Sequence, residues 1–163
     1  MTDGGSSLPE VRRLLASLVA AKPAGAIAEI GTAFGEATLA MADVLGPTAT
    51  LVSVERDRDR CEHARETLAG SRVELIHGRW EDVLPDGGPF DLIFFDGGPT
   101  EPGLDMAIDL LAPGGVLVKD DLTPGRETAG DPVRERLLLD QRLIGVEVLT
   151  TPTTAAIIAT RRA

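Results

Sequence analysis

Short apolar runs alternate with segments of helical periodicity along most of the chain. Apolar runs of strand length fall at residues 26–30, 50–54, 73–77, 90–95 and 115–119. Apolar residues that recur every three or four positions predict helices at about 7–21, 34–45, 57–69, 102–111 and 132–143. This alternation predicts a parallel sheet covered by helices, with the strongly apolar strand at 90–95 near its centre.

The pattern changes after Lys119. Residues 120–131 are polar and contain Pro124, Gly125 and Gly130, so they predict a loop that is long enough to suspect a function. Two further strands are predicted at 145–149 and 155–160, and the Thr/Pro turn between them is too short for a crossover helix. This last pair must therefore form an antiparallel hairpin.

The composition is that of one globular domain. The chain has 163 residues, 43% of them hydrophobic, which fits a single domain over residues 1–163. The formal net charge of −10 would repel nucleic acid, so we expect no nucleic-acid partner. Cys61 is the only cysteine, which excludes an internal disulfide and a multi-cysteine zinc site and fits a reducing compartment. The sequence shows no signal peptide and no apolar span of about 18 residues, so we expect a cytoplasmic protein that does not bind membranes.

A glycine-containing turn lies between the first predicted strand and the helix that follows. It reads Glu29-Ile30-Gly31-Thr32-Ala33-Phe34-Gly35. Glycines let the backbone approach a ligand closely, and a helix N-terminus offers unpaired amides. The dinucleotide fingerprint needs a middle glycine to seat a pyrophosphate, and Ala33 stands in its place. The turn therefore favours a ligand without a pyrophosphate; a turn that serves only packing is the alternative.

Glu55 ends the second predicted strand. An acidic side chain at this point, about twenty residues after the turn, accepts hydrogen bonds from ribose hydroxyls in folds of this kind. The alternative is a solvated loop residue. Together with the turn, Glu55 indicates a ligand that has a ribose but no pyrophosphate.

Four motifs follow one another along the chain. They are Glu-Ile-Gly-Thr at 29–32 with Gly35, Val-Ser-Val-Glu at 52–55, Phe-Asp-Leu-Ile-Phe-Phe-Asp at 90–96 and Leu-Leu-Ala-Pro-Gly-Gly at 110–115. In this order the chain, from about Ala26 to Arg161, resembles the class I S-adenosylmethionine-dependent methyltransferases, in particular the small-molecule O-methyltransferases of the catechol and caffeoyl-CoA type. The resemblance implies an α/β, Rossmann-like fold with a seven-stranded, mostly parallel sheet in the order 3-2-1-4-5-7-6. Strand 7 would be antiparallel, with helices on both faces.

The resemblance also implies a binding site for S-adenosylmethionine. Its residues would be Glu29, Gly31, Thr32, Ala33, Gly35, Glu55, Arg56, Arg79, Trp80 and Asp96. Of these, Glu29, Gly31, Ala33 and Gly35 would line the methionine end of the cofactor, and Glu55 would bind the ribose.

The adenine end departs from the family pattern. The family usually has Gly-Asp-Ala after the third strand, whereas this chain has Gly78-Arg79-Trp80-Glu81-Asp82. Arg79 takes the place of the acid and cannot accept a hydrogen bond. Glu81 or Asp82 would supply the missing acceptor. Trp80 would either cover the adenine face or pack on the core.

Three aspartates end two of the predicted strands. Asp96 ends the fourth, and Asp120 and Asp121 end the fifth, so their side chains should converge at the carboxyl edge of the sheet. The resembled family has Asp, Asp and Asn at these positions, and there they hold Mg²⁺ or a similar hard cation, which prefers oxygen ligands. Such a cation would lower the pKa of a substrate hydroxyl and orient its oxygen. Three solvated loop charges are the alternative.

Lys119 and Asp96 are the candidate catalytic residues. The family often has Lys and Tyr soon after the first metal-binding Asp, but Gly97-Gly98-Pro99-Thr100 follows Asp96 here, and the chain contains no tyrosine. Lys119 would act as a base, as an ion-pair partner of the aspartates, or as an edge residue that reaches into solvent.

Only one predicted helix, at about 7–21, precedes the first strand, whereas full members of the resembled family have a longer N-terminal segment over the substrate. The acceptor pocket would then be open, completed by a second subunit in a homodimer, or roofed by the 120–131 loop.

The resemblance implies methyl transfer from S-adenosylmethionine to an oxygen of a small hydroxylated acceptor, assisted by Mg²⁺ or another divalent cation. A cofactor-binding or partner subunit without chemistry of its own is the alternative. A nicotinamide dehydrogenase is disfavoured, because the middle glycine is absent.

Overall fold

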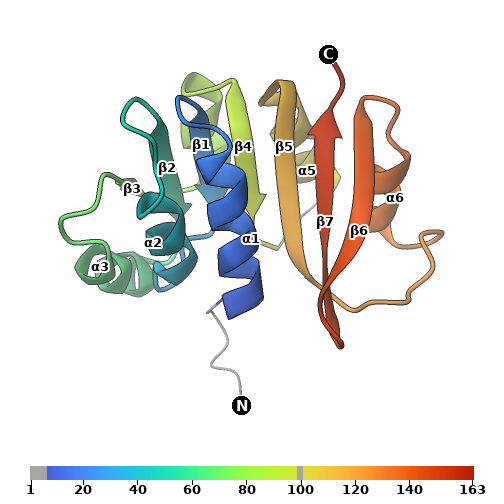
Figure 1. The fold of residues 1–163 in the computed structure, drawn as a ribbon, viewed down its shortest axis with the longest axis horizontal. Helices are drawn as coiled ribbons and strands as arrows, with labels where there is room; N and C mark the ends of the chain where they lie inside the picture. The colour runs from blue at the N-terminus through green and yellow to red at the C-terminus, as the bar shows by residue number, and fades with distance from the viewer. Residues whose placement is uncertain (1–6, 99–100) are drawn as a thin grey trace.

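The strands form one seven-stranded sheet in the order β3-β2-β1-β4-β5-β7-β6 (Figure 1). A computed structural model describes residues 7–98 and 101–163. The strands are β1 (Ala26–Ile30), β2 (Thr50–Glu55), β3 (Glu74–His77), β4 (Phe90–Phe95), β5 (Leu111–Leu122), β6 (Leu143–Thr151) and β7 (Thr154–Arg161). All neighbouring strands pair in parallel except β7, which pairs antiparallel with β5 and with β6. The predicted sheet order, the closing hairpin and the central position of β4 are confirmed.

Helices cover both faces of this sheet (Figure 1). They are α1 (Pro9–Ala20), α2 (Glu36–Ala42), α3 (Arg58–Thr67), α4 (Trp80–Val83), α5 (Glu101–Asp109) and α6 (Pro132–Leu139), and a 3-10 turn, η1, spans Leu84–Asp86. Leu15 of α1 and Met41 of α2 are buried in the apolar layer on one face. Leu104 of α5 and Leu137 of α6 are buried in the layer on the other face.

The predicted element bounds hold best where an apolar run has sharp polar ends. The strands at 26–30 and 90–95 have the predicted bounds. α2 begins at Glu36 instead of about residue 34, because Gly35 has a φ of 87° and interrupts the helical conformation. The sequence did not predict α4 or η1, since elements of 4 and 3 residues show no periodicity.

Strand β5 differs most from its prediction. It has 12 residues instead of the five predicted at 115–119, and its ladder shifts register twice, opposite Phe90/Leu92 of β4 and between its own Lys119 and Leu122. Leu122 still pairs with Ala155 of β7, so the strand continues past Lys119. The prediction that the loop begins at Asp120 is therefore wrong: Asp120 and Asp121 belong to the strand.

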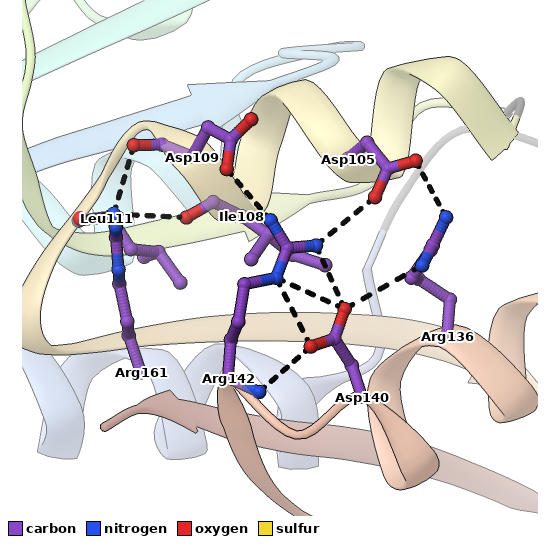
Figure 2. A network of polar contacts seen from close by, with 8 residues as sticks. All are labelled: Asp105, Ile108, Asp109, Leu111, Arg136, Asp140, Arg142 and Arg161. Carbon is purple, nitrogen blue, oxygen red and sulfur yellow. Dashed lines mark hydrogen bonds and ion pairs between the residues drawn. The ribbon is translucent and has the colours of Figure 1, made fainter.

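An arginine and aspartate network holds α5 against the start of β6 (Figure 2). Arg142 pairs with Asp140, Asp105 and Asp109 at 2.8, 3.1 and 2.8 Å. Arg161 donates hydrogen bonds to backbone carbonyls at the end of α5, including that of Asp109 at 3.0 Å, and so satisfies carbonyls that a helix end leaves unpaired. The network therefore fixes α5, the helix that follows β4 in the chain.

Arg134 is buried under the loop that leaves β5. Arg134, 1% exposed, forms two hydrogen bonds to the carboxylate of Glu147 on β6, at 2.8 and 3.0 Å. It also bonds the carboxylate of Asp131 at 2.6 Å and the carbonyl of Thr123 at 2.7 Å. These contacts tie both ends of the loop to β6, since Thr123 begins the segment and Asp131 ends it.

Candidate functional site

A pocket of about 540 Å³ lies at the carboxyl edge of β1, β2 and β4. Residues that follow these strands line it, among them Gly31 and Ala33, Glu55 and Arg56, and Asp96. Ligands bind at this edge in open α/β sheets, because the strands of both halves end there. The volume suits a small organic ligand.

The turn after β1 is held by backbone bonds and contains three residues with positive φ. These are Gly31 at 91°, Ala33 at 49° and Gly35 at 87°. The Gly31 amide donates to the carbonyl of Val54 at 2.9 Å, and the Gly35 amide donates to that of Thr32 at 2.9 Å. Ala33, at the place of the missing middle glycine, thus takes a conformation that glycine adopts more easily.

The two glycines of the turn make room for neighbouring protein. A Cβ on Gly31 would lie 3.1 Å from the backbone nitrogen of Gly97, and one on Gly35 would lie 3.3 Å from a side-chain carbon of Leu68. Close packing therefore disfavours a side chain at both positions, and Gly31 also lines the pocket.

We expect Gly31→Ala to lower the free energy of unfolding by about 1–3 kcal/mol, because an L side chain is strained at this φ and would also press on the β4 loop. Urea unfolding monitored by circular dichroism measures the change. Gly78→Ala is the matched control, since a Cβ there would meet only Val83 at 3.7 Å. Equal stability of the two variants would contradict the packing interpretation.

Glu55 joins the β1 turn to the beginning of α3. Its carboxylate is buried, and it accepts hydrogen bonds from the amides of Ala33 at 2.8 Å and Asp57 at 2.9 Å, one at each oxygen. Each carboxylate oxygen has a second lone pair available for another donor. Glu55 is therefore a fixed acceptor in the pocket wall and not a solvated loop residue.

Glu29 lies behind the pocket wall. Its side chain is fully buried, and the hydroxyls of Thr38 and Ser53 both donate to its Oε2. Among the described residues, its Oε1 has no hydrogen-bond partner. Glu29, Thr32 and Gly35, which the resemblance placed at the cofactor, do not line the pocket, whereas Gly31 and Ala33 do.

Burial raises the pKa of Glu29 from 4.5 to about 7. The folded protein therefore favours the protonated carboxyl, and its contribution to stability is complete below pH 4.5 and is lost as the pH rises through 7. Between pH 4.5 and 8, the free energy of unfolding of the wild type should therefore decrease by about 3 kcal/mol more than that of Glu29→Gln, which has no carboxyl group at this position. Urea titrations across this pH range give both curves. Glu62→Gln, on an exposed side chain, is the control, and parallel curves for Glu29→Gln and wild type would contradict the prediction.

The segment after β3 forms the far wall of the pocket. Trp80 lines the pocket and also packs edge-on against Phe95, with ring centroids 5.5 Å apart. Trp80 can therefore pack on the core and still present a surface to an adenine ring in the pocket. Arg79 lines the same wall and pairs weakly with Glu81 at 3.6 Å and Asp82 at 3.9 Å.

The sequence did not single out several of the lining residues, among them Ser7, Arg60 and Gly103. Arg60 lies in the first turn of α3, directly after the Glu55 strand end. Because helices that follow parallel strands begin at the same edge of the sheet, its position in the predicted order was a usable signal. Ser7 precedes α1, and no sequence pattern connected it to this edge.

Asp96, Asp120 and Asp121 come together at the ends of β4 and β5. Each offers a carboxylate oxygen, and these atoms all lie within 4.8 Å of one another. Asp120 is buried, Asp96 is half-buried and Asp121 is exposed. Side chains of consecutive strand residues normally point to opposite faces. Here the register shift and a φ of 59° at Asp121 place both neighbours in one cluster.

The electrostatics of this cluster favour binding of a positive charge. Burial and repulsion from Asp120 raise the pKa of Asp96, and burial raises the pKa of Asp120 as well. The Oδ1 atom of Asp120 is buried and makes no hydrogen bond to the described residues. A buried carboxylate oxygen without a hydrogen bond, among three acids, fits a hard divalent cation, which takes oxygen ligands. The residues present therefore suit such an ion.

Lys119 lies beside the cluster. It is 6% exposed, its ammonium donates to the carbonyl of Asp120 at 2.9 Å, and Nζ is 4.0 Å from Asp120 Oδ1. This geometry matches the ion-pair alternative and not a side chain that reaches into solvent. The sequence predicts Lys119 as the last residue of its strand, but β5 continues to Leu122.

Within the described residues, Asp121 is the only member of the 120–131 segment that lines the pocket. The segment therefore does not roof the pocket in this structure. None of the helices in the described ranges combines the length and apolar character of a membrane-spanning helix.

Comparisons with known proteins agree with this geometry. A family described as a methyltransferase domain matches residues 28–122. A catechol O-methyltransferase from Mycobacterium tuberculosis is 35% identical over 121 residues, which is 69% of this chain and 55% of that protein. A putative O-methyltransferase from Mycobacterium avium is 31% identical over 138 residues, or 78% of this chain and 61% of that protein. The chain thus spans little more than half the length of these relatives.

Solved structures share the fold. The O-methyltransferase TomG from Streptomyces achromogenes, in complex with S-adenosylmethionine, is 25% identical with a TM-score of 0.76, and the match covers 99% of this chain and 83% of that one. A methyltransferase from Geobacter sulfurreducens has a TM-score of 0.81 at 21% identity, covering 96% of this chain and 81% of that one.

Proposed function

The chain belongs to the class I S-adenosylmethionine-dependent O-methyltransferases, and on that premise we propose that it transfers the cofactor's methyl group to an oxygen of a small hydroxylated acceptor. The observation that carries the proposal is the pocket with Glu55 on one side and the three-aspartate cluster on the other. Glu55 suits the ribose of the cofactor, and the aspartate cluster suits the place where the methyl group meets the acceptor. Membership of this family also disfavours the nicotinamide dehydrogenase alternative.

Glu55 would bind the ribose hydroxyls, and the backbone of Gly31 and Ala33 would lie along the methionine end of the cofactor. Trp80 would contact the adenine ring from the far wall, with Arg56 and Arg79 at the rim of the pocket. Glu29 would act from behind the wall, by holding the turn through Thr38 and Ser53. The lining residues are assigned by their position at the pocket. For Glu55 and Glu29, the hydrogen bonds that fix the carboxylate support the assignment as well.

In the transfer step, the acceptor hydroxyl would give its proton to Asp96 or to solvent, and its oxygen would attack the methyl carbon in line with the bond to sulfur. That bond breaks, its electron pair stays on sulfur, and S-adenosylhomocysteine leaves. The chain's contribution is to hold the two reactants in contact and to exclude water, which removes much of the entropic barrier.

Asp96, Asp120 and Asp121 would hold Mg²⁺ or another divalent cation. When bound, such a cation lowers the pKa of the acceptor hydroxyl and orients its oxygen. Asp96 lines the pocket, as Asp121 does, and it follows β4, the strand beside β1. We therefore propose Asp96 as the catalytic aspartate. Lys119 would act through its charge on Asp120, as an ion-pair partner.

Two measurements test the proposal. Calorimetric titration with S-adenosylmethionine, S-adenosylhomocysteine and NAD should give binding of the first two only. Methyl transfer to a panel of catechols and other hydroxylated acceptors, with Mg²⁺ present, should give methylated product. Cofactor binding with no transfer to any acceptor would favour a cofactor-binding subunit without chemistry of its own, and the absence of cofactor binding would overturn the proposal.

A further inference from the structure

Lys119 places a buried positive charge against the aspartate cluster. Its side chain is 8% exposed, and it leaves β5 at a position that pairs with Ile157 of β7. The chain contains only one other lysine, Lys22, which lies outside the pocket lining. A lysine is strongly hydrated and is seldom buried without a charge partner. Its burial here therefore reflects the carboxylates beside it.

The ammonium acts on the aspartates as a charge and not as a hydrogen-bond donor. Within the described residues, its hydrogen bond goes to the backbone carbonyl of Asp120, at 2.9 Å. The distance from Nζ to Asp120 Oδ1 is 4.0 Å, which is within ion-pair range but longer than a hydrogen bond. That oxygen therefore keeps its lone pairs for a further partner.

The charges of the cluster determine what that partner can be. When all three carboxylates are ionised, as binding of a cation requires, they carry −3, and the Lys119 ammonium reduces the total to −2. A divalent cation brings the centre to neutrality, and it is then held next to an ammonium of the same sign. Since Lys119 and Asp120 are both buried, this repulsion is screened less than on the surface.

We infer that Lys119 is a resident counter-ion of the aspartate centre, which stabilises the cluster without metal and lowers its affinity for a divalent cation. The inference rests on the proposed metal site and goes beyond it, because it assigns the strength of binding to a residue that does not contact the ion. Metal would then bind reversibly and would be gained and lost without unfolding of the centre.

The test is direct titration with Mn²⁺, with free Mn²⁺ followed by electron paramagnetic resonance. Lys119→Met and Lys119→Gln both remove the charge, and the second keeps a donor for the Asp120 carbonyl. Both should bind Mn²⁺ at least tenfold more tightly than the wild type and should melt at a lower temperature in chelator. Lys119→Arg, which keeps the charge, and Lys22→Met, which removes the other lysine, should bind within about threefold of the wild type.

S-adenosylhomocysteine affinity, measured on the same samples, reports on the fold and on the proposed cofactor site. Unchanged Mn²⁺ affinity in Lys119→Gln, with the wild type binding Mn²⁺, overturns the role of Lys119 and leaves the metal site standing. If no variant binds Mn²⁺ while S-adenosylhomocysteine binds to all, both the metal site and this inference fall, and the methyltransferase proposal stands. If Lys119→Met does not fold, Lys119→Gln decides.

Discussion

The double variant Asp96→Asn with Asp120→Asn should lose all response to Mg²⁺ or Mn²⁺, and its methyl transfer should fall to background. In the wild type, saturating metal should raise the melting temperature by about 5–10 °C. This follows because a ligand at one hundred times its dissociation constant adds about 2.7 kcal/mol to a folded protein, and 1 kcal/mol corresponds to about 2–4 °C for a chain of this size.

The same variant should be no less stable than the wild type in chelator. Two carboxylates about 4 Å apart repel by about 4 kcal/mol at an effective dielectric of about 20. The asparagines remove the repulsion between all three pairs, and Asp121 remains as a counter-charge for Lys119. Differential scanning fluorimetry with metal and with chelator measures both effects.

Asp43→Asn with Asp86→Asn removes two exposed carboxylates and is the matched control. It should keep the metal response and the activity of the wild type. A wild type whose melting temperature and activity are both indifferent to chelator would rule out metal assistance, and would leave Asp96 and Lys119 as the local groups at the reacting end.

Glu55→Ala should weaken S-adenosylhomocysteine binding at least tenfold. Hydrogen bonds to a charged acceptor contribute about 1.5–3 kcal/mol each, and we expect two of them from the ribose. The substitution also leaves the buried Ala33 amide without its acceptor, which should lower the free energy of unfolding by about 1–3 kcal/mol. Calorimetry measures the affinity, and urea unfolding measures the stability.

A ligand change separates these two effects of Glu55→Ala. In the wild type, the 2′-deoxy analogue of S-adenosylhomocysteine should bind more weakly than the parent compound, because it has lost one hydroxyl donor. In Glu55→Ala the two ligands should bind equally. Glu62→Ala, on the exposed face of α3, should behave like the wild type. If the wild type binds the two ligands equally, Glu55 does not accept a hydrogen bond from the 2′-hydroxyl of the ribose.

Much of the site was predictable because strand ends determine it. Glu55 and Asp96 each end an apolar run or follow it directly, so the topology alone brings them to one edge. Glu29 was harder to place. β1 is a central strand, and four of its five residues are buried, so alternation of side chains did not indicate whether Glu29 faced the ligand or the core. Hydrogen bonds from Thr38 on α2 and Ser53 on β2 hold its carboxylate in the core, and the sequence did not indicate these partners.

The end of β5 was not predictable for a different reason. Polar residues after Lys119 are typical of a loop, yet pairing of Leu122 with Ala155 extends the strand. A strand hydrogen bond depends on the partner strand, and β7 is about 35 residues away in sequence. The short helix α4 escaped prediction because it is a single turn, held by the contact of Trp80 with Phe95.

Because the register of β5 shifts between Lys119 and Leu122, the position of the Asp121 carboxylate depends on the number of residues in this segment as well as on their type. Removing one residue between Lys119 and Leu122 would restore an even ladder with β7 and send neighbouring side chains to opposite faces. The acidic centre would then be dismantled although Asp96 and an aspartate on β5 were still present. A search for equivalent centres in other chains should therefore compare strand register, and a substitution scan that keeps the chain length constant would miss this dependence.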